Sequence, residues 1–366
     1  MGVPFLFPML AILLTADGFR HLTANDLTYF VDSGTITVMR NKIRHSQLVV
    51  GQLVAEPGTR IDGHIKVGSM PDGTAVRLPI VLINGRYPGK TFYIQAISDG
   101  DELNGIAVIH KVLSTITPEQ LYGKIIAVPL VNFHAFHTKQ ALNPVDNRKM
   151  NRCFPGRRDG TSSERTAYHL FRRAIQQADY CLDLHQGGVH PMIDEVRVRV
   201  DEKHTLHGAC LELARVFGIG HILNQQGPEG QLAQAAPEIG IPTIDPELGG
   251  THGWDTKSIE KGVRGVLNVL QYYKFIAGTP QIPDRQIVVK KFVPVLSNEG
   301  GFVYYKAELY EQLAMYQPIA DICDVFGNVR ESIRAPVDGV FWAKPIYPMV
   351  ASGGIVGKIG TPIEYL

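Results

Sequence analysis

The feature that most constrains the fold is a β-rich run that ends in two carboxylates and leads directly into a helical pattern. Residues 91–96 form the run, and Asp99 and Glu102 follow it at a spacing of i and i+3. Apolar residues then recur at helical spacing: Leu103, Ile106, Ile109, Val112 and Leu113. Open α/β sheets bind their ligands at the carboxyl ends of strands, where this pair lies. Acidic residues also stabilise the start of a helix, so the pair alone favours a structural role over metal binding.

Composition limits the class of protein. The chain has 366 residues, of which 45% are hydrophobic and 19% charged, so it can bury a large core and form two domains. A net charge of +1 provides no basic stripe, which argues against a nucleic-acid partner. Its four cysteines show neither CxxC pairs nor the spacing of a disulfide framework, which suits a reducing cytoplasm.

The first 46 residues form an N-terminal extension of uncertain role. No charge precedes Asp17, and the apolar run 3–16 resembles a signal-peptide core without its basic start. The run is too short for a transmembrane helix, so we expect no membrane partner. Three explanations stay open, namely a weak export signal, a packing arm, or an extension upstream of a start near Met39. We favour an arm or an extension.

Alternating strands and helices occupy residues 47–279. Apolar or β-branched runs predict strands at 48–54, 61–67, 76–84, 91–96, 125–131, 178–184 and 240–247. A capping-box pattern at Thr161–Glu164 precedes one amphipathic helix, and a last helix covers 259–270. This alternation predicts an α/β domain with a doubly wound, mostly parallel sheet.

The composition changes after Gly278. Residues 280–283 are typical of a linker, and short β-like runs separated by glycine and proline follow. We therefore expect a domain boundary near 280 and a small C-terminal β-barrel domain over 284–366.

Two more predicted strands end in residues that can carry chemistry. His185 follows a buried strand and precedes two glycines, and Glu247 ends another strand. A dense polar loop over 143–156 lies between core elements, where binding residues are common. A single histidine at such a position is more often structural, but the three strand ends together favour a shared site.

Five ordered motifs carry a resemblance to a known family. They are Gly100-Asp101-Glu102-Leu103-Asn104-Gly105, Met150-Asn151-Arg152-Cys153-Phe154-Pro155-Gly156, Asp183-Leu184-His185, Glu247-Leu248-Gly249-Gly250, and the C-terminal Ala335-Pro336-Val337-Asp338-Gly339. With them the chain, from about residue 47 to 366, resembles the succinylglutamate desuccinylase/aspartoacylase family. The resemblance implies a fold of the zinc-carboxypeptidase type.

The resemblance also implies roles for six residues. Asp99, Glu102 and His185 match the family's zinc ligands, and three protein ligands leave a position open for water. A metal there would acidify the water and polarise the scissile carbonyl. Glu247 matches the general base. Asn151 and Arg152 match the pair that binds a substrate carboxylate.

The chain departs from the family pattern at Asp99, where the family has histidine. Two carboxylates and one imidazole make a harder site, so manganese, cobalt or iron become plausible beside zinc. Three outcomes stay open: an active enzyme with a retuned metal, an enzyme with a changed mechanism, or a non-catalytic relative. The family's upstream arginine is also absent, because Lys139-Gln140-Ala141 occupies that region. Arg148 and Lys149 are the candidates to stabilise the oxyanion in its place.

We therefore expect a cytoplasmic, metal-dependent deacylase that cleaves the C–N bond of a small N-acyl amino acid or a related carboxylate-bearing amide. The alternatives are a non-catalytic binding or regulatory relative and a carboxypeptidase. The expected cofactor is one divalent ion, with zinc favoured. The expected partner is the small N-acyl amine itself, and a homo-oligomer stays open.

Overall fold

The computed structural model describes residues 20–24, 27–32, 35–40, 46–187, 192–250 and 253–366. The chain divides into two compact units, residues 1–45 and 46–366. The first unit contains a three-stranded antiparallel sheet of β1 (Arg20–Ala24), β2 (Leu27–Asp32) and β3 (Thr35–Arg40). The apolar run 3–16 lies outside the described residues. The predicted division of the second unit near residue 280 stays a prediction.

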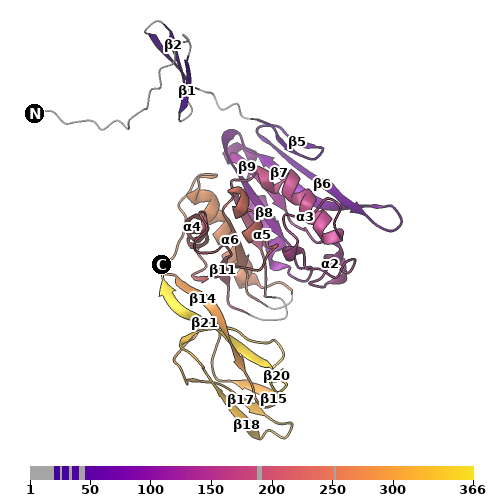
Figure 1. The fold of residues 1–366 in the computed structure, drawn as a ribbon, viewed down its shortest axis with the longest axis vertical. Coiled ribbons are helices and arrows are strands. Elements are labelled where there is room, and N and C mark those ends of the chain that lie inside the picture. Colours follow the sequence, from indigo (N-terminus) through magenta and orange to yellow (C-terminus); the bar gives the residue numbers. More distant parts are fainter. Residues whose placement is uncertain (1–19, 25–26, 33–34, 41–45, 188–191, 251–252) are drawn as a thin grey trace, which may run out of the picture. The chain divides into compact units, whose positions relative to one another are not determined.

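A 12-stranded sheet organises the second unit (Figure 1). Its order is β16-β19-β21-β14-β12-β11-β13-β10-β8-β9-β7-β6. The strands of the α/β part are β6 (Thr59–Ser69), β7 (Ala75–Asn84), β8 (Tyr87–Ala96), β9 (Tyr122–Val128), β10 (Tyr180–Leu184), β11 (Glu195–Val198), β12 (His221–Asn224), β13 (Thr243–Glu247) and β14 (Ile287–Leu296). Every residue of β10 and β13 is buried, so both faces of the sheet are covered at its centre.

The 12-stranded sheet is mixed, and among the strands of its α/β part five pairings are parallel and three antiparallel, which agrees with the expectation of a mostly parallel α/β sheet. Strand β8 runs parallel to β9 and β10, and β10 runs parallel to β13. Strand β7 is antiparallel to both β6 and β9, and β11 is antiparallel to β13. Strands β6 and β7 are joined by a short turn instead of a helical crossover, and a short turn can only connect antiparallel strands. The predicted strand 48–54 is wrong as one strand, because Gly51 adopts a positive φ of 64° between β4 (Leu48–Val50) and β5 (Leu53–Ala55).

Six α-helices are present among the described residues. They are α1 (Asn104–Thr115), α2 (Phe133–Thr138), α3 (Ser162–Arg173), α4 (His207–Phe217), α5 (Leu232–Ala235) and α6 (Thr256–Tyr272). Helix α1 begins one residue after the predicted Leu103 and buries Ile109, Val112 and Leu113, as its spacing predicts. The capping box is confirmed, because the Thr161 N–H donates to Glu164 Oε2 at 2.8 Å. No helix in the described ranges is long and apolar enough to cross a membrane.

The C-terminal strands form two antiparallel layers instead of a closed barrel, which corrects the expectation of a small C-terminal β-barrel. Strands β16 (Gln312–Leu313), β19 (Gly339–Ala343) and β21 (Ile355–Tyr365) extend the large sheet beyond β14. Strands β15 (Gly301–Tyr305), β17 (Pro318–Cys323), β18 (Val329–Arg334) and β20 (Met349–Val350) form a separate sheet. Side chains of both layers share one core that includes Val303, Ile319 and Phe341. The first residues of β14, Ile287 to Val289, pair with β12, so this strand is shared between the α/β sheet and the C-terminal layer.

Candidate metal centre

The three predicted ligands come from two adjacent strands of the sheet. Asp99 and Glu102 follow the end of β8, and His185 follows the end of β10, which pairs with β8 in parallel. One nitrogen or oxygen from each of the three residues lies within 4.8 Å of the other two. Asp99 and His185 are each 3% exposed. The structure therefore brings these three side chains together in one buried group, called the triad below.

The turn that presents the carboxylates is tightly constrained. Ile97 adopts a left-handed φ of 59°, which is unusual for a β-branched residue and marks local strain. A Cβ on Gly100 would lie 2.1 Å from the Ala135 carbonyl carbon, so only glycine fits between the turn and α2. A Cβ on Gly105 would lie 2.9 Å from the Cβ atoms of both Ala96 and Leu184. The two glycines of this motif thus let the turn and α1 pack closely against the strands.

The side chain of Gln186, two residues after the end of β10, accepts hydrogen bonds from backbone N–H groups at the start of α1. Gln186 Oε1 accepts the backbone N–H of Leu103 at 2.8 Å and that of Asn104 at 3.0 Å. The Gln186 N–H in turn donates to Glu102 Oε2 at 3.0 Å. These bonds satisfy backbone donors that a helix start leaves open, and they tie the ligand turn to the end of β10.

The donor set fits a divalent cation. Asp99 Oδ1 is buried and accepts no hydrogen bond from any residue that the structure describes, although a buried carboxylate oxygen needs a donor or a cation. His185 Nδ1 lies 2.9 Å from Glu102 Oε2, so the imidazole and this carboxylate converge. Two carboxylates and an imidazole with one unsatisfied oxygen are ligands that first-row divalent metals accept.

A second carboxylate lies behind His185. His185 Nε2 lies 3.2 Å from Asp183 Oδ2. The other oxygen, Asp183 Oδ1, accepts hydrogen bonds from Gln95 Nε2 at 3.0 Å and from Ser98 Oγ at 3.1 Å. Asp183, His185 and Asp245 also come within 4.8 Å of one another. Asp183 is hydrogen-bonded within the core and its Oδ2 lies beside His185 Nε2, so it occupies the position of an outer carboxylate behind a ligating histidine, although the 3.2 Å contact lacks hydrogen-bond geometry.

Several carboxylates are buried close together around His185, and burial disfavours their charged forms. Burial raises the pKa of Glu102 to about 8, with His185 opposing the shift and Asp99 adding to it. Burial also raises the pKa of Asp245 to about 6. For His185, burial lowers the pKa, but Asp183 and Glu102 outweigh it and hold the pKa well above its ordinary value. A bound cation would relieve this concentration of carboxylates.

Glu247 lies at the end of β13, and a parallel β-bridge joins its backbone to His185. The side chain of Glu247 is buried and forms an ion pair with Arg197 Nη1 at 2.6 Å. Arg197 Nε also pairs with Glu195 Oε1 at 2.6 Å, so one guanidinium bridges two carboxylates. Burial opposes the charge on Arg197, yet Glu195 and Glu247 raise its pKa above the ordinary value. Arg197 therefore fixes the position of Glu247.

The polar loop reaches the metal centre through Lys149. Lys149 Nζ lies 2.9 Å from Asp99 Oδ2. Asn151 and Arg152 follow in the short 3-10 helix Met150–Arg152, where Arg152 Nη1 donates to Asn151 Oδ1 at 3.0 Å. Phe154 N–H donates to the Gly230 carbonyl at 3.0 Å and anchors the loop. The structure thus places this loop beside the triad, with Lys149 as its direct contact.

Arg148 and three histidines that lie near these motifs in the sequence were further candidates to contact the substrate. Arg148 pairs with Glu164 at 2.9 Å and does not face the triad. His137 Nδ1 bonds to the Phe133 carbonyl at 2.8 Å within α2, and His134 lines a separate cavity of about 480 Å³. His190 lies outside the described residues.

Sequence reasoning missed Arg197. Its signal was the alternation of charged and apolar residues in Glu195-Val196-Arg197-Val198-Arg199, a pattern that is unusual for a buried strand. Arg199 extends the pattern, with its Nε 3.4 Å from Asp245 Oδ2. Buried cations in a strand need buried carboxylates beside them, so this segment pointed towards the acidic strand ends.

Comparisons with known proteins show which proteins this chain is similar to. The sequence model of the succinylglutamate desuccinylase/aspartoacylase catalytic domain matches residues 88–273. N-alpha-acetyl-L-2,4-diaminobutyric acid deacetylase of Halomonas elongata is 28% identical over 301 residues, which cover 80% of this chain and 88% of the relative. A product-bound ectoine utilization protein from Ruegeria pomeroyi superposes with a TM-score of 0.75 at 24% identity, over 83% of this chain and 95% of that one. A succinylglutamate desuccinylase/aspartoacylase from Rhodobacter sphaeroides gives 0.72 at 25%, over 82% and 96%.

Proposed function

Because this chain belongs to the succinylglutamate desuccinylase/aspartoacylase family, we propose that it is a metal-dependent deacylase that hydrolyses the amide bond of a small N-acyl amino acid. The observation that carries the proposal is the convergence of Asp99, Glu102 and His185, with Glu247 bridged to His185 through the backbone. The relative from Halomonas elongata is named for removing an acetyl group from an amino acid, which supports this class of substrate.

Asp99, Glu102 and His185 would hold one divalent ion, and Asp183 would orient His185 from behind. The ion, when bound, supplies an acidified water and polarises the acyl carbonyl. Zinc is favoured for the imidazole, and the second carboxylate makes manganese, cobalt or iron plausible. Lys149 offsets the charge that Asp99 brings in place of the family's histidine.

Glu247 would act as general base, taking a proton from water and passing it to the departing nitrogen. Arg197 holds this carboxylate in place through the 2.6 Å ion pair, so Glu247 need not reorganise during the reaction. Lys149 is the better candidate to stabilise the oxyanion, because Arg148 is engaged with Glu164. Asn151 and Arg152 would bind the substrate carboxylate, a role that suits a guanidinium fork.

The test is a panel of N-acyl amino acids offered to the purified protein with zinc, manganese, cobalt or iron. We expect hydrolysis of at least one member, and a 10²- to 10⁴-fold loss of kcat in Glu247→Gln with metal content unchanged. Amide-capped substrates should be poorer than free carboxylates, and Arg152→Ala should remove that preference by raising KM for the free carboxylates alone. Hydrolysis of peptides instead would favour a carboxypeptidase. A loaded protein that cleaves nothing would favour a non-catalytic relative.

A further inference from the structure

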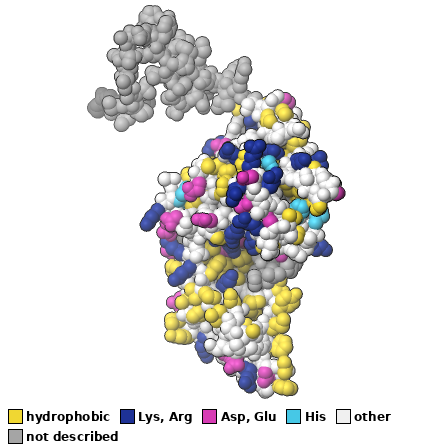
Figure 2. Space-filling model, turned by 45° about the vertical axis from the view of Figure 1, so that its right-hand side comes forward, with side chains coloured by type: hydrophobic (Ala, Val, Ile, Leu, Met, Phe, Trp, Pro, Cys, Tyr) yellow, Lys and Arg dark blue, Asp and Glu magenta, His cyan; other side chains and the backbone are white. Residues whose placement is uncertain are grey.

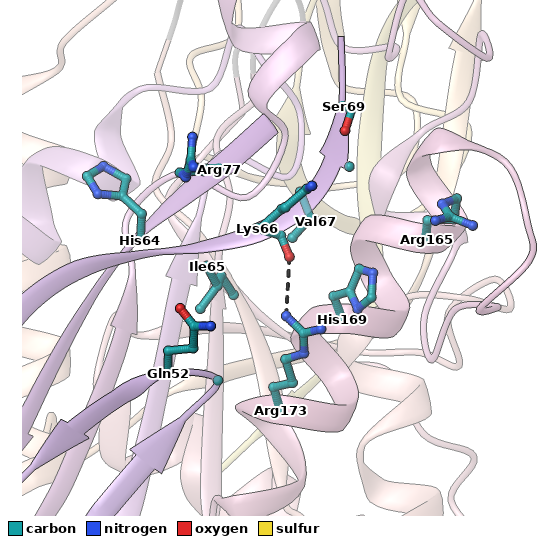
Figure 3. Close-up of a pocket in the computed structure, with 12 residues that line it drawn as sticks. Gln52, His64, Ile65, Lys66, Val67, Ser69, Arg77, Arg165, His169 and Arg173 are labelled. Atoms are coloured by element: carbon teal, nitrogen blue, oxygen red, sulfur yellow. Dashed lines mark hydrogen bonds between the residues drawn. The ribbon is translucent and has the colours of Figure 1, made fainter. Parts of the chain in front are cut away.

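A basic pocket lies on the edge of the sheet, away from the metal centre. It has a volume of about 830 Å³, and six of its lining residues are basic: His64, Lys66, Arg77, Arg165, His169 and Arg173. Figure 3 shows them drawn from β6 and β7 on one side and from α3 on the other. Strand β6 is the last strand of the sheet and lies three strands from β8. At about 4.8 Å per strand this is on the order of 15 Å.

The sheet side of this basic pocket holds like charges next to each other. Lys66 of β6 lies directly opposite Arg77 of β7 in the antiparallel register. His64 lies two residues before Lys66 and therefore on the same face of the strand. Like charges opposite each other on a sheet are destabilising, so the fold carries a cost here.

Helix α3 also holds basic residues next to each other. Arg165, His169 and Arg173 follow one another at a spacing of four residues, which places them in one row on α3. Arg173 Nη1 donates to the Lys66 carbonyl at 3.2 Å and joins the helix row to β6. Burial lowers the pKa of His169, and Arg173 and Arg165 lower it further.

No carboxylate balances these charges. No acidic residue lines the basic pocket, and in the described part of the chain none forms an ion pair with its two arginines on α3, with Lys66 or with Arg77. The nearby acids are engaged elsewhere, Asp62 with Arg60 and Glu164 with Arg148. The whole chain has a net charge of only +1, so this concentration is local. Figure 2 shows Lys and Arg side chains gathered over the α/β part on the face in view.

We propose that the basic pocket binds a small polyphosphate anion. Four permanent cations on β6, β7 and α3 line this one cavity, which suits a ligand with several negative charges, and the guanidinium groups suit phosphate oxygens. The volume exceeds the need of a single phosphate and lies in the range of small-molecule sites. A free polyphosphate and a nucleoside triphosphate share this chemistry.

The experiment is calorimetric titration of the full chain with inorganic triphosphate and, separately, with adenosine triphosphate. We expect saturable binding of one anion per chain, with tighter binding of the nucleotide only if a nucleoside also contacts the protein. Arg165→Glu and Arg77→Glu, both exposed residues on separate elements, should each weaken binding about 10- to 100-fold. Arg172→Glu makes the same charge change on α3 outside the basic pocket and should change binding less than about twofold.

Three results would overturn the proposal. One is the absence of saturable binding by both anions. Another is that Arg172→Glu weakens anion binding as much as Arg165→Glu and Arg77→Glu do, which would show that the anion is attracted by the overall charge and not bound in the basic pocket. The third is loss of binding after a chelator removes the divalent metal, which would place the anion at the metal centre. If the wild type is a dimer that Arg77→Glu dissociates while neither anion binds, a second copy of the chain covers the basic pocket instead.

Discussion

The metal centre and the basic pocket each hold like charges close together, but they do so in different surroundings. Asp99 and His185 are buried at strand ends in the middle of the sheet, whereas Lys66, Arg77 and Arg165 are exposed at its edge. In the buried centre the carboxylates gain partners, such as Lys149 for Asp99. At the edge, water screens the charges, and the described residues supply no carboxylate partner.

The difference teaches how each site can be recognised. At the buried site, burial raises the pKa of Glu102 with Asp99 adding to the shift, and Asp99 Oδ1 has no hydrogen-bond partner among the described residues. Exposed like charges leave a smaller mark, which here is the direct opposition of Lys66 and Arg77. Both arrangements favour a ligand of opposite charge, a cation in the first and an anion in the second.

The largest expected effect on stability comes from removing Arg197, the buried cation that pairs with Glu195 and Glu247. Arg197→Met would leave Glu195 and Glu247 without their cation, so we expect a loss of about 3–5 kcal/mol in the free energy of unfolding. Arg197→Lys keeps the charge and should lose less. Arg172→Met, at an exposed arginine, should change stability by less than about 0.5 kcal/mol. Denaturant unfolding measures all three, and an Arg197→Met protein as stable as the Arg172→Met control would contradict the account.

Two histidines, His185 and His221, have pKa values that shift in opposite directions. His185 lies among carboxylates, whereas burial lowers the pKa of His221 to about 4 and Lys261 lowers it further. The unfolded chain, with a histidine pKa of about 6.5, binds this proton first, so stability falls as the pH drops from about 6.5 towards 4. We expect His221 to contribute about 1–3 kcal/mol to that loss.

Thermal unfolding across this pH range tests the contribution. The His221→Phe protein should lose less stability towards acid than the wild type, and His110→Phe, at an exposed position, should follow the wild type. Identical acid profiles for His221→Phe and the wild type would show that His221 is not held neutral by the fold.

The smallest effect concerns the exposed charges. Lys66→Thr removes the like charge opposite Arg77 and should raise the free energy of unfolding by about 0.2–1 kcal/mol when no polyanion is present. The gain should shrink at high salt, which screens the repulsion. Arg60→Thr, on the same strand but at a cation already paired with Asp62, should give no gain. Equal gains from both variants would mean that strand propensity, not charge, is responsible.

The proximity of Asp99, Glu102 and His185 could be predicted from sequence because its parts are local. Asp99 and Glu102 share one turn, and each strand end is marked by an apolar run that stops at a polar residue. Parallel neighbours then bring those ends together, which the β8–β10 pairing confirms. The start of α1 and the capping box of α3 were predictable for the same reason.

The features that sequence missed depend on pairing between distant segments. Nothing local shows that β11 runs antiparallel to β13 and carries Arg197 to Glu247. The pairing of β14 with β12, which joins the C-terminal strands to the large sheet, is likewise a matter of tertiary structure. The basic pocket draws on β6, β7 and α3, and only the row on the helix leaves a periodic pattern.

The measurement that tests the central claim most directly is elemental analysis after dialysis against one mixed-metal buffer. We expect one divalent ion per wild-type chain and loss of it in Asp99→Ala, because two protein ligands rarely hold a first-row ion tightly. Asp99→His should keep the ion and shift the preference towards zinc. Asp101→Ala removes a neighbouring carboxylate outside the triad and should retain the wild-type content. A wild type that emerges without metal, or an Asp99→Ala protein that holds as much as the wild type, would contradict the account.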